Sequence, residues 1–306
     1  MIYENFDQLV RQINIGSKEK KVVAVMAAED SHTLEAVVQA GRVGVIESIL
    51  IGDKGKIREQ LTLLDENPAK YSIIHAKTSE EVVLKATGLV NDGEAQFLMK
   101  GLLRTGEMMR TLLSEKASFR TDRQMTHLSV VKIPNYHKLI GLTDVALSIL
   151  PDLALKRVIV ENAVSAMSVM GFDAPKVAIL AAVETVNPKM PDTVDAAALK
   201  KLNIDGSIPG CTIEGPISYD LAISQEAAEL KGYESQVCGD VDLLVVPNLA
   251  TGNVLLKALR YSAQASSAGI VVGGKVPLVL TSRAAEVASK YLPIILAAAA
   301  SSAKVH

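Results

Sequence analysis

The stretch KVVAVMAAEDSHTLEAVVQAGRVG, Lys21 to Gly44, predicts the fold class of this chain. Its first part is apolar and rich in valine, which is typical of a strand buried on both faces. An amphipathic helical pattern follows at once, with Asp30 or Ser31 as its expected N-cap. Short apolar strands that alternate with helices are typical of βαβ units, so we predict a largely parallel α/β sheet. The same alternation recurs downstream at ESILIGD, YSIIHA and AQFLMKG.

The middle of the chain interrupts this alternation. MTHLSVVKIP and KLIGLTDVAL are separated only by the short loop Pro134 to His137, which predicts an antiparallel hairpin. Strands and helices alternate again after Pro151. We therefore expect a two-domain α/β/α architecture with mostly parallel sheets and an interdomain cleft. Residues 1–140 with 270–306 would form the first domain, and residues 141–269 the second.

The composition excludes several classes of function. The 306 residues carry a net charge of −2 at pH 7, so no global field attracts nucleic acid or an anionic membrane. Aromatic residues make up 4% and tryptophan is absent, which leaves little to stack on bases. No apolar run approaches the ~20 residues that span a bilayer, and the N-terminus has no apolar signal segment. We expect a cytoplasmic protein that binds neither nucleic acid nor membranes.

The residues that commonly hold metals are scattered. Cys211 and Cys238 lie far apart and outside any CxxC spacing. The five histidines have neither carboxylates nor one another at the spacing of metal ligands. Neither a G-x-G-x-x-G nor a Walker A sequence occurs, which disfavours a dinucleotide site and a P-loop. We therefore expect no metal site, no Rossmann dinucleotide site and no P-loop.

Polar clusters follow four of the predicted strands. In open parallel sheets, ligands bind outside the carboxyl ends of the strands, so these clusters predict where the site lies. We expect one cleft to collect them. The clusters are Lys100-Gly101, Glu214-Gly215-Pro216, Asn248 with Thr251-Gly252-Asn253, and Thr281-Ser282-Arg283.

The segment VVPNLATGNVLLKAL indicates an anion site. A strand is predicted to end at Pro247, and Thr251-Gly252-Asn253 is predicted to open a helix whose exposed amides bind an anion. Asn248 lies between the two. Ordinary capping and turn chemistry uses the same residue types and stays the alternative interpretation.

The segment Thr281-Ser282-Arg283 indicates a second anion contact. Arg283 is predicted to begin a helix, where a cation opposes the macrodipole, so an anion held between the guanidinium and the helix amides would explain it. The alternative is that Arg283 extends its charged end to solvent or pairs with a nearby acid such as Glu286. Because Ser282 has no triad partner and no G-x-S-x-G elbow, we interpret it as a hydrogen-bond donor and not as a nucleophile.

Three charged residues complete the candidate set. Lys100 at a strand end and Arg110 in the following helix add cations, and for the strand-end lysine simple solvation is the alternative. Glu214 is either an acid near the substrate or a simple cap for the next helix.

Five segments resemble the phosphate acetyl/butyryltransferase family, and more closely its butyryltransferase branch. The resemblance covers essentially the whole chain, and the order of the segments makes it specific. The segments are TDVALSILPD, VAILAAVETVNPKMPDTVDAA, GCTIEGPISYDLAIS, PNLATGNVLLKAL and VPLVLTSRA.

This resemblance implies two α/β domains related to the isocitrate and isopropylmalate dehydrogenase fold. It also implies transfer of an acyl group between coenzyme A and inorganic phosphate, without a metal or prosthetic group, in a homodimer or a larger homo-oligomer. Ser282 and Arg283 match the active-site Ser-Arg pair of the acetyltransferases, and Arg110 matches a substrate-binding arginine.

Two positions depart from the family pattern. Ser289 stands where the acetyltransferases carry an Asp proposed to deprotonate the thiol, and Val145 follows Asp144 where they carry a Cys. The general base is therefore open among Glu214, Asp144 and water.

The expected reaction is acyl-CoA + phosphate ⇌ acyl phosphate + CoA, with butyryl or a similar short chain preferred, by direct attack in a ternary complex. Arg283 would hold the phosphoryl group together with the amides near Thr251 to Asn253. Ser282 would donate a hydrogen bond to the thiol or to the developing oxyanion. Two alternatives stay open: a metal- and NAD-dependent hydroxyacid dehydrogenase on the related fold, and a non-catalytic sensor of acyl phosphates or CoA thioesters.

Overall fold

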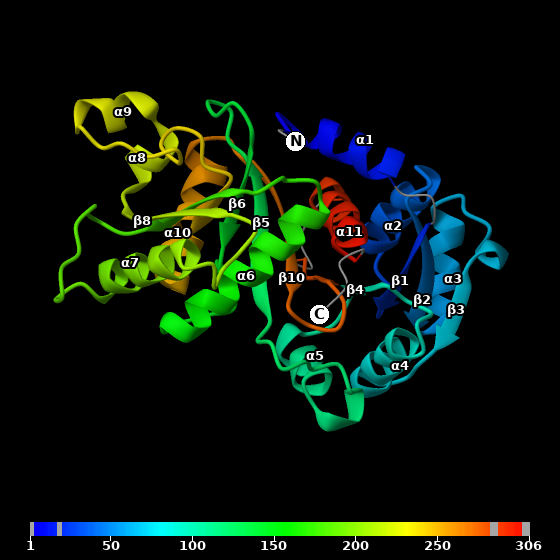
Figure 1. The fold of residues 1–306 in the computed structure, drawn as a ribbon. Helices are drawn as coiled ribbons and strands as arrows, with labels where there is room; N and C mark the ends of the chain where they lie inside the picture. The colour runs from blue at the N-terminus through cyan, green and yellow to red at the C-terminus, as the bar shows by residue number, and fades with distance from the viewer. Residues whose placement is uncertain (1–2, 17–19, 282–286, 302–306) are drawn as a thin grey trace. The chain divides into compact units, whose positions relative to one another are not determined.

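The structure is a computed structural model that describes residues 3–16, 20–281 and 287–301 (Figure 1). The chain divides into two compact units. The first unit comprises Val10–Arg123 and Ala268–His306, and the second comprises Met1–Leu9 and Gln124–Ser267. The division therefore lies at residues 123 and 124, whereas the sequence placed it near residue 141. The physical reason is the hairpin of β5 (Thr126–Lys132) and β6 (Leu139–Thr143), whose two strands pair with each other and stay together.

The sheet of the first unit has the strand order β3-β2-β1-β4-β11-β10. The pairs from β3 to β11 are all parallel, and only β10 runs antiparallel to its neighbour β11. This confirms the parallel α/β sheet predicted from the first strands. The strands are β1 (Lys21–Met26), β2 (Ile46–Gly52), β3 (Ser72–His75), β4 (Phe97–Lys100), β10 (Ser266–Val272) and β11 (Leu278–Val279).

The helices of the first unit form two groups. α2, α3 and α11 pack together, whereas α4 contacts α5 and the strands β1 and β2. Asp30 is the N-cap of α2, as the sequence predicted. The helices are α1 (Phe6–Gly16), which crosses the division, α2 (Ser31–Arg42), α3 (Lys54–Leu63), α4 (Ser79–Asn91), α5 (Thr105–Leu112) and α11 (Val287–Ala300), with short 3-10 turns η1 (Pro68–Lys70) and η2 (Glu115–Ala117).

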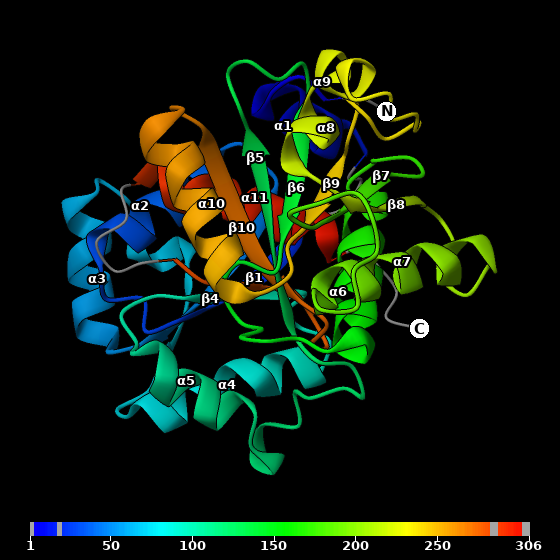
Figure 2. The ribbon, with the colours of Figure 1, turned by 90° about the vertical axis from the view of Figure 1, so that its left-hand side faces the viewer.

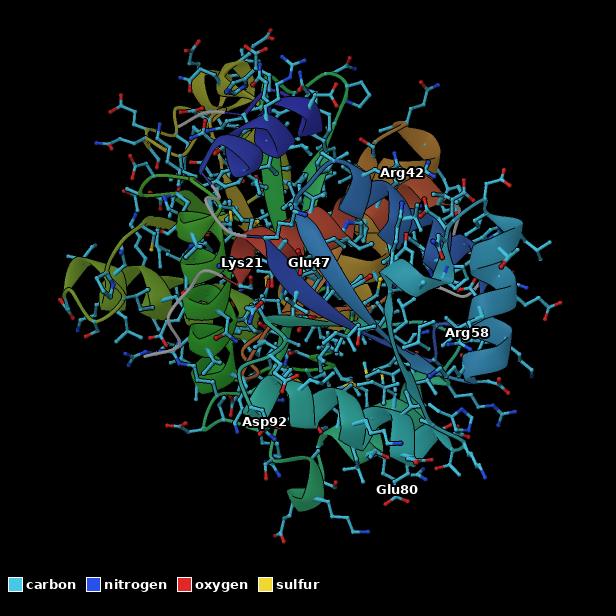
Figure 3. The ribbon with its side chains drawn as sticks, turned by 90° about the vertical axis from the view of Figure 1, so that its right-hand side faces the viewer. Lys21, Arg42, Glu47, Arg58, Glu80 and Asp92 are labelled. Carbon is cyan, nitrogen blue, oxygen red and sulfur yellow. The ribbon has the colours of Figure 1, made fainter. Side chains whose placement is uncertain are left out.

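The central strand β1 shows why this unit folds as it does. Four consecutive residues, Val23 to Met26, are fully buried, because helices cover both faces of a parallel sheet. Only the amino end of the strand reaches solvent, where Lys21 lies beside the neighbouring strand that carries Glu47 (Figure 3). The carboxyl end is therefore the edge to search for a site.

The sheet of the second unit has the strand order β5-β6-β9-β7-β8. β5 and β6 pair antiparallel, which confirms the predicted hairpin, and the remaining pairs are parallel. The elements that follow the hairpin are α6 (Leu153–Val169), β7 (Lys176–Leu180), α7 (Pro191–Ile204), β8 (Thr212–Ile217), α8 (Tyr219–Ile223), α9 (Gln225–Leu230), β9 (Leu243–Val245) and α10 (Leu249–Ser262).

Helices lie on two sides of this sheet (Figure 2), and alternating residues of its strands face these two layers. Gly141 faces α6, where an added Cβ would lie 2.9 Å from the Met167 sulfur. The next residue, Leu142, faces the opposite way, into a core that includes Leu244 of β9 and Leu259 of α10. The side-chain period of two in a strand places α6 and α7 on one face and α10 on the other.

The described residues contain no helix that is long and apolar enough to cross a bilayer. Nor do any three His, Cys, Asp or Glu side chains among the described residues gather as a metal site would require.

Candidate functional site

Lys100 lies where the sequence placed it, at the carboxyl end of β4. Its side chain is 3% exposed, and the ammonium donates to the carbonyls of Gly101 and Leu103 at 3.2 and 3.3 Å. The following backbone closes over the end of β1: the Gly101 amide donates to Met26, and a Cβ at residue 101 would lie 2.2 Å from the Ala27 carbonyl. Glycine is therefore required next to the buried lysine.

Ser282 and Arg283 lie outside the described residues. The strand that leads to them is described: β11 is parallel to β4, and its Val279 is paired with Met99. Thr281 therefore follows at the same carboxyl edge as Lys100. This places the start of the Thr281-Ser282-Arg283 segment at the predicted sheet edge of the first unit.

Arg110 lies in the last turn of α5 and is exposed. No hydrogen bond or ion pair within the described part of the chain involves its side chain. The substrate-binding role that the resemblance implies for Arg110 stays a prediction.

The sequence did not predict a buried lysine in the helix after Arg283. Lys290 in α11 is 1% exposed, and its ammonium lies 3.1 Å from the Asp30 carboxylate and 3.0 Å from the Thr33 hydroxyl. Asp30 caps the helix that follows β1, so the pair ties the start of α11 to the carboxyl edge of the sheet. A single cation in the apolar stretch VASKYLPIIL was the only available signal.

The predicted start of the helix at Thr251 is corrected by the structure. α10 begins at Leu249, and Asn248 is its N-cap, because the Asn248 side-chain oxygen accepts from the Thr251 amide at 3.0 Å and from the Thr251 hydroxyl at 3.1 Å. The Gly252 amide already donates to the Asn248 carbonyl at 3.1 Å. The amides of Thr251 and Gly252 are therefore occupied, whereas the Asn248 NH₂ and the Ala250 amide have no hydrogen-bond partner among the described residues.

Gly252 and Asn253 instead hold α10 against the loop that follows β6. A Cβ at residue 252 would lie 2.9 Å from the Asp144 carbonyl and 2.8 Å from a Val246 methyl. The Asn253 side-chain amide donates to the Val145 carbonyl at 3.4 Å. These two residues position the first turn of the helix.

Asp144, a candidate base, is 2% exposed and accepts four hydrogen bonds. One carboxylate oxygen accepts from the amides of Ala146 and Leu147, and the other accepts from the Ser148 hydroxyl and the His127 amide. Its lone pairs are therefore used within the protein. This geometry suits a structural carboxylate better than a proton acceptor.

His127 lies beside this carboxylate on β5. It is 9% exposed, and its Nδ1 atom has no hydrogen-bond partner in the described residues. Burial lowers the pKa of His127 below its usual value, and the nearby Asp144 charge only partly opposes this effect. The imidazole is therefore neutral at neutral pH.

Glu214 lies inside β8 and not at a strand end as predicted. Its carboxylate is 2.6 Å from the Lys200 ammonium and accepts from the Tyr233 hydroxyl at 3.0 Å. Burial alone would raise the Glu214 pKa, but the hydrogen bonds from Lys200, Ser235 and Tyr233 outweigh it and the pKa falls below its usual value. Glu214 is therefore neither a helix cap nor a basic carboxylate.

A second carboxylate, Glu184, lies after β7, the strand next to β8 in the sheet. It accepts a short hydrogen bond from the Ser218 hydroxyl and lies 3.3 Å from the Lys231 ammonium. The hydrogen bond from Ser218 is the main reason why the Glu184 pKa lies below its usual value. No periodic pattern in the sequence pointed to Glu184, because it lies in an irregular loop.

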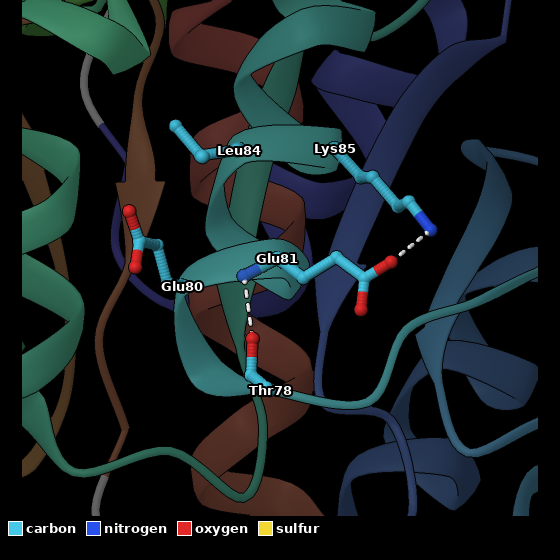
Figure 4. A pocket seen from close by; sticks show the side chains of 5 residues that line it. All are labelled: Thr78, Glu80, Glu81, Leu84 and Lys85. Carbon is cyan, nitrogen blue, oxygen red and sulfur yellow. Dashed lines mark hydrogen bonds and ion pairs between the residues drawn. The ribbon is translucent and has the colours of Figure 1, made fainter.

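Two hollows on the surface contain none of the predicted site residues. One, of about 510 Å³, is formed around the turn between β5 and β6, at the end of β6 opposite to the candidate site. The other hollow, of about 410 Å³, lies at the start of α4 (Figure 4) and is lined by Thr78, Glu80, Glu81, Leu84 and Lys85. Its polar groups bind one another: the Thr78 hydroxyl accepts from the Glu81 amide, and the Lys85 ammonium is 2.8 Å from the Glu81 carboxylate.

The chain is similar to known proteins along most of its length. Residues 80–298 match the sequence profile of a family described as phosphate acetyl/butaryl transferase. The chain is 39% identical over 295 residues to a phosphate butyryltransferase of Clostridium acetobutylicum, which covers 96% of this chain and 97% of that protein. It is 40% identical over 290 residues to a phosphate acetyltransferase of Thermotoga maritima, with 95% and 98% covered. A branched-chain phosphotransacylase from Enterococcus faecalis has a similar crystal structure, with a TM-score of 0.82, 31% identity, and 93% of this chain and 100% of that chain covered.

Proposed function

Because the chain belongs to the phosphate acetyl/butaryl transferase family, we propose that it transfers a short acyl group, preferably butyryl, between coenzyme A and inorganic phosphate. The observation that carries the proposal is the first turn of α10. There the Asn248 side-chain oxygen accepts from Thr251, and neither the Asn248 NH₂ nor the Ala250 amide has a hydrogen-bond partner within the described part of the chain. Donors at a helix N-terminus suit a phosphate oxygen.

In the proposed reaction, a phosphate oxygen attacks the thioester carbonyl, the C–S bond breaks and the thiolate leaves. The proton that the phosphate group still carries is released to water, and water supplies one to the thiolate. Arg283 holds the phosphate bidentately, and Ser282 donates a hydrogen bond to the carbonyl oxygen as it becomes negative. Phosphate is already anionic, so this direction needs no general base. Neither Asp144 nor Glu214 is assigned that task, because both carboxylates already accept several hydrogen bonds.

Lys100 and Arg110 belong to the same proposal as further cations for the phosphate or for the phosphates of coenzyme A. The predicted cleft, the homo-oligomer and the cytoplasmic location stay predictions. The dehydrogenase and sensor alternatives are not favoured, since the relatives of similar length are named as transferases.

The assay follows release of free thiol from acyl-CoA in the presence of phosphate. With acetyl-, propionyl-, butyryl- and isobutyryl-CoA compared, butyryl-CoA should give the highest kcat/KM. Arg283→Ala should raise the apparent KM for phosphate steeply, whereas Ser282→Ala should lower kcat by roughly 10²- to 10³-fold. Arg58→Ala, on the exposed face of α3 (Figure 3), is the matched control and should change neither value.

Asn248→Asp tests the carrying observation directly. Aspartate keeps the cap, because its oxygen still accepts from Thr251, but it removes the NH₂ donors and adds a negative charge. The apparent KM for phosphate should rise at least roughly tenfold, with thermal stability unchanged. A wild-type KM in this variant would remove α10 from the site, and a wild type without transferase activity on any of the four thioesters would end the proposed function.

A further inference from the structure

The loop that follows β6 contacts the first turn of α10 at three points. The Leu249 amide donates to the Ile149 carbonyl at 3.2 Å, and the Asn253 side chain donates to the Val145 carbonyl at 3.4 Å. Between them, the Asp144 carbonyl lies so close to α10 that a Cβ added at residue 252 would be 2.9 Å from its oxygen. The position of this helix start therefore depends on the shape of the loop.

The shape of the loop in turn depends on one buried carboxylate. Asp144 accepts from the Ala146 and Leu147 amides at 2.9 and 3.0 Å and from the Ser148 hydroxyl at 2.9 Å. These three bonds close the turn onto itself. A fourth, from the His127 amide at 3.2 Å, fastens the turn to β5, and the Thr143 hydroxyl returns a bond to the His127 carbonyl at 2.8 Å. Hydrogen bonds to an ionised carboxylate are among the stronger ones in proteins.

We propose that Asp144 is a positioning residue for the reaction: its carboxylate shapes the loop, and the loop sets the first turn of α10 and hence the Asn248 side chain that binds phosphate. On the side of α10, the same contact requires glycine at residue 252, since any side chain there would keep the loop carbonyl of Asp144 from coming so close. The inference rests on the proposed function for the identity of the ligand. It replaces the general-base role that the sequence left open for Asp144.

The two roles predict opposite kinetic signatures for Asp144→Asn. The amide oxygen can still accept from Ala146 and Leu147, whereas the NH₂ group meets the His127 amide as donor against donor. A positioning residue predicts an apparent KM for phosphate raised about tenfold, a kcat within about threefold of wild type and an unchanged pH profile of kcat. Loss of a general base predicts a kcat lowered by roughly 10²- to 10⁴-fold, with the limb of the pH profile that reports the base removed.

Asp242→Asn is the matched control. Asp242 is also a partly buried carboxylate of the same unit, which accepts from the Lys176 amide at 2.8 Å and lies 2.7 Å from the Lys138 ammonium, but it lies at the opposite ends of the strands. It should lower thermal stability without changing the KM for phosphate. Equal KM changes in the two variants would show a merely structural effect and overturn the proposal.

Two further measurements keep the inference separate from the proposed function. Amide hydrogen exchange at Thr251 and Gly252 should be faster in Asp144→Asn than in wild type or Asp242→Asn, whether or not the protein transfers acyl groups; unchanged exchange there would overturn the positioning role. A double-mutant cycle of Asp144→Asn and Gly252→Ala should give clearly non-additive changes in the KM for phosphate. Both substitutions disturb the same contact, the close approach of the Asp144 carbonyl to residue 252. Additive changes in KM would contradict the proposal that Asp144 and Gly252 act through the same contact.

Discussion

The Lys290 ammonium lies 3.1 Å from the Asp30 carboxylate, and the two residues join helices from opposite ends of the chain. The lysine side chain is 2% exposed and the aspartate side chain 18%. The Thr33 hydroxyl binds both partners, so the three groups form a small closed network at the N-terminus of α2. α11 is thereby fastened to the first unit immediately after the segment that contains Ser282 and Arg283.

The Lys290–Asp30 pair predicts unequal single-mutant effects. Asp30→Asn leaves a buried ammonium without its charge partner and should lower the free energy of unfolding by about 3 kcal/mol or more. Lys290→Met leaves a carboxylate that is partly solvated and should lower it less, by about 2 kcal/mol. Urea unfolding of the single and double variants measures both, and the double variant should lose less than the sum. Equal, small losses would contradict a desolvated pair.

The close approach at Gly101 predicts a backbone clash. Gly101→Ala places a Cβ within 2.2 Å of the Ala27 carbonyl and should lower the free energy of unfolding by roughly 1–3 kcal/mol or more. Gly106→Ala in α5 is the control, because in the described part of the structure nothing beyond its own helix lies within 4 Å of its Cβ position. That control should be neutral or should raise stability by about 0.5–1 kcal/mol. Thermal unfolding of both variants would reveal whether only residue 101 is constrained.

His127 predicts a loss of stability in mild acid. Burial holds its pKa below the usual value of about 6.5, so the unfolded chain binds a proton at a higher pH than the folded protein does. The contribution that neutral His127 makes to the free energy of unfolding is therefore fully present above pH ~6.5. It is lost progressively as the pH falls from there toward the folded pKa. His127→Gln should flatten this decline, whereas His32→Gln, at an exposed position, should leave it unchanged. Unfolding free energies between pH 7.5 and 5 check the slope.

Glu214 predicts a second, more acidic decline. Its folded pKa lies below the usual carboxyl value, so its contribution is present above pH ~4.3 and is lost as the pH falls through the folded pKa. Glu214→Gln should lower the free energy of unfolding at pH 7 by about 1–2 kcal/mol, a figure reduced because Lys200 is 38% exposed. The loss should shrink near pH 3. A pH-independent loss would show that packing, and not charge, is responsible.

Much of the fold could be predicted from local patterns. The apolar strand Lys21–Met26, the capped helix after it and the hairpin around Pro134 were all predicted correctly, because side-chain periodicity and turn residues act over a few neighbours. The family resemblance, carried by five ordered segments, is confirmed by the relatives. The predicted roles of Ser282 and Arg283 stay predictions.

The candidate site was less predictable where its residues depend on distant partners. Thr251 is a residue type that often begins a helix. The N-cap is nevertheless Asn248, because its side-chain oxygen accepts from the Thr251 amide. Glu214 was expected at a strand end, but pairing with β7 extends β8 past it. Each error shifts an element boundary by only a few residues, but it changes which polar groups are already bonded within the protein.

The sequence by itself determined the alternation of strands and helices, the hairpin and the polar residue at the end of β4, because these follow from patterns of neighbouring residues. Only the tertiary structure decided that Asp144 is enclosed by four donors, that Lys290 is paired with Asp30, and that Gly252 receives a carbonyl from another element. The physical reason is that burial and pairing depend on which elements pack together. Side chains of ordinary local character become buried charges or steric requirements only when remote parts of the chain meet.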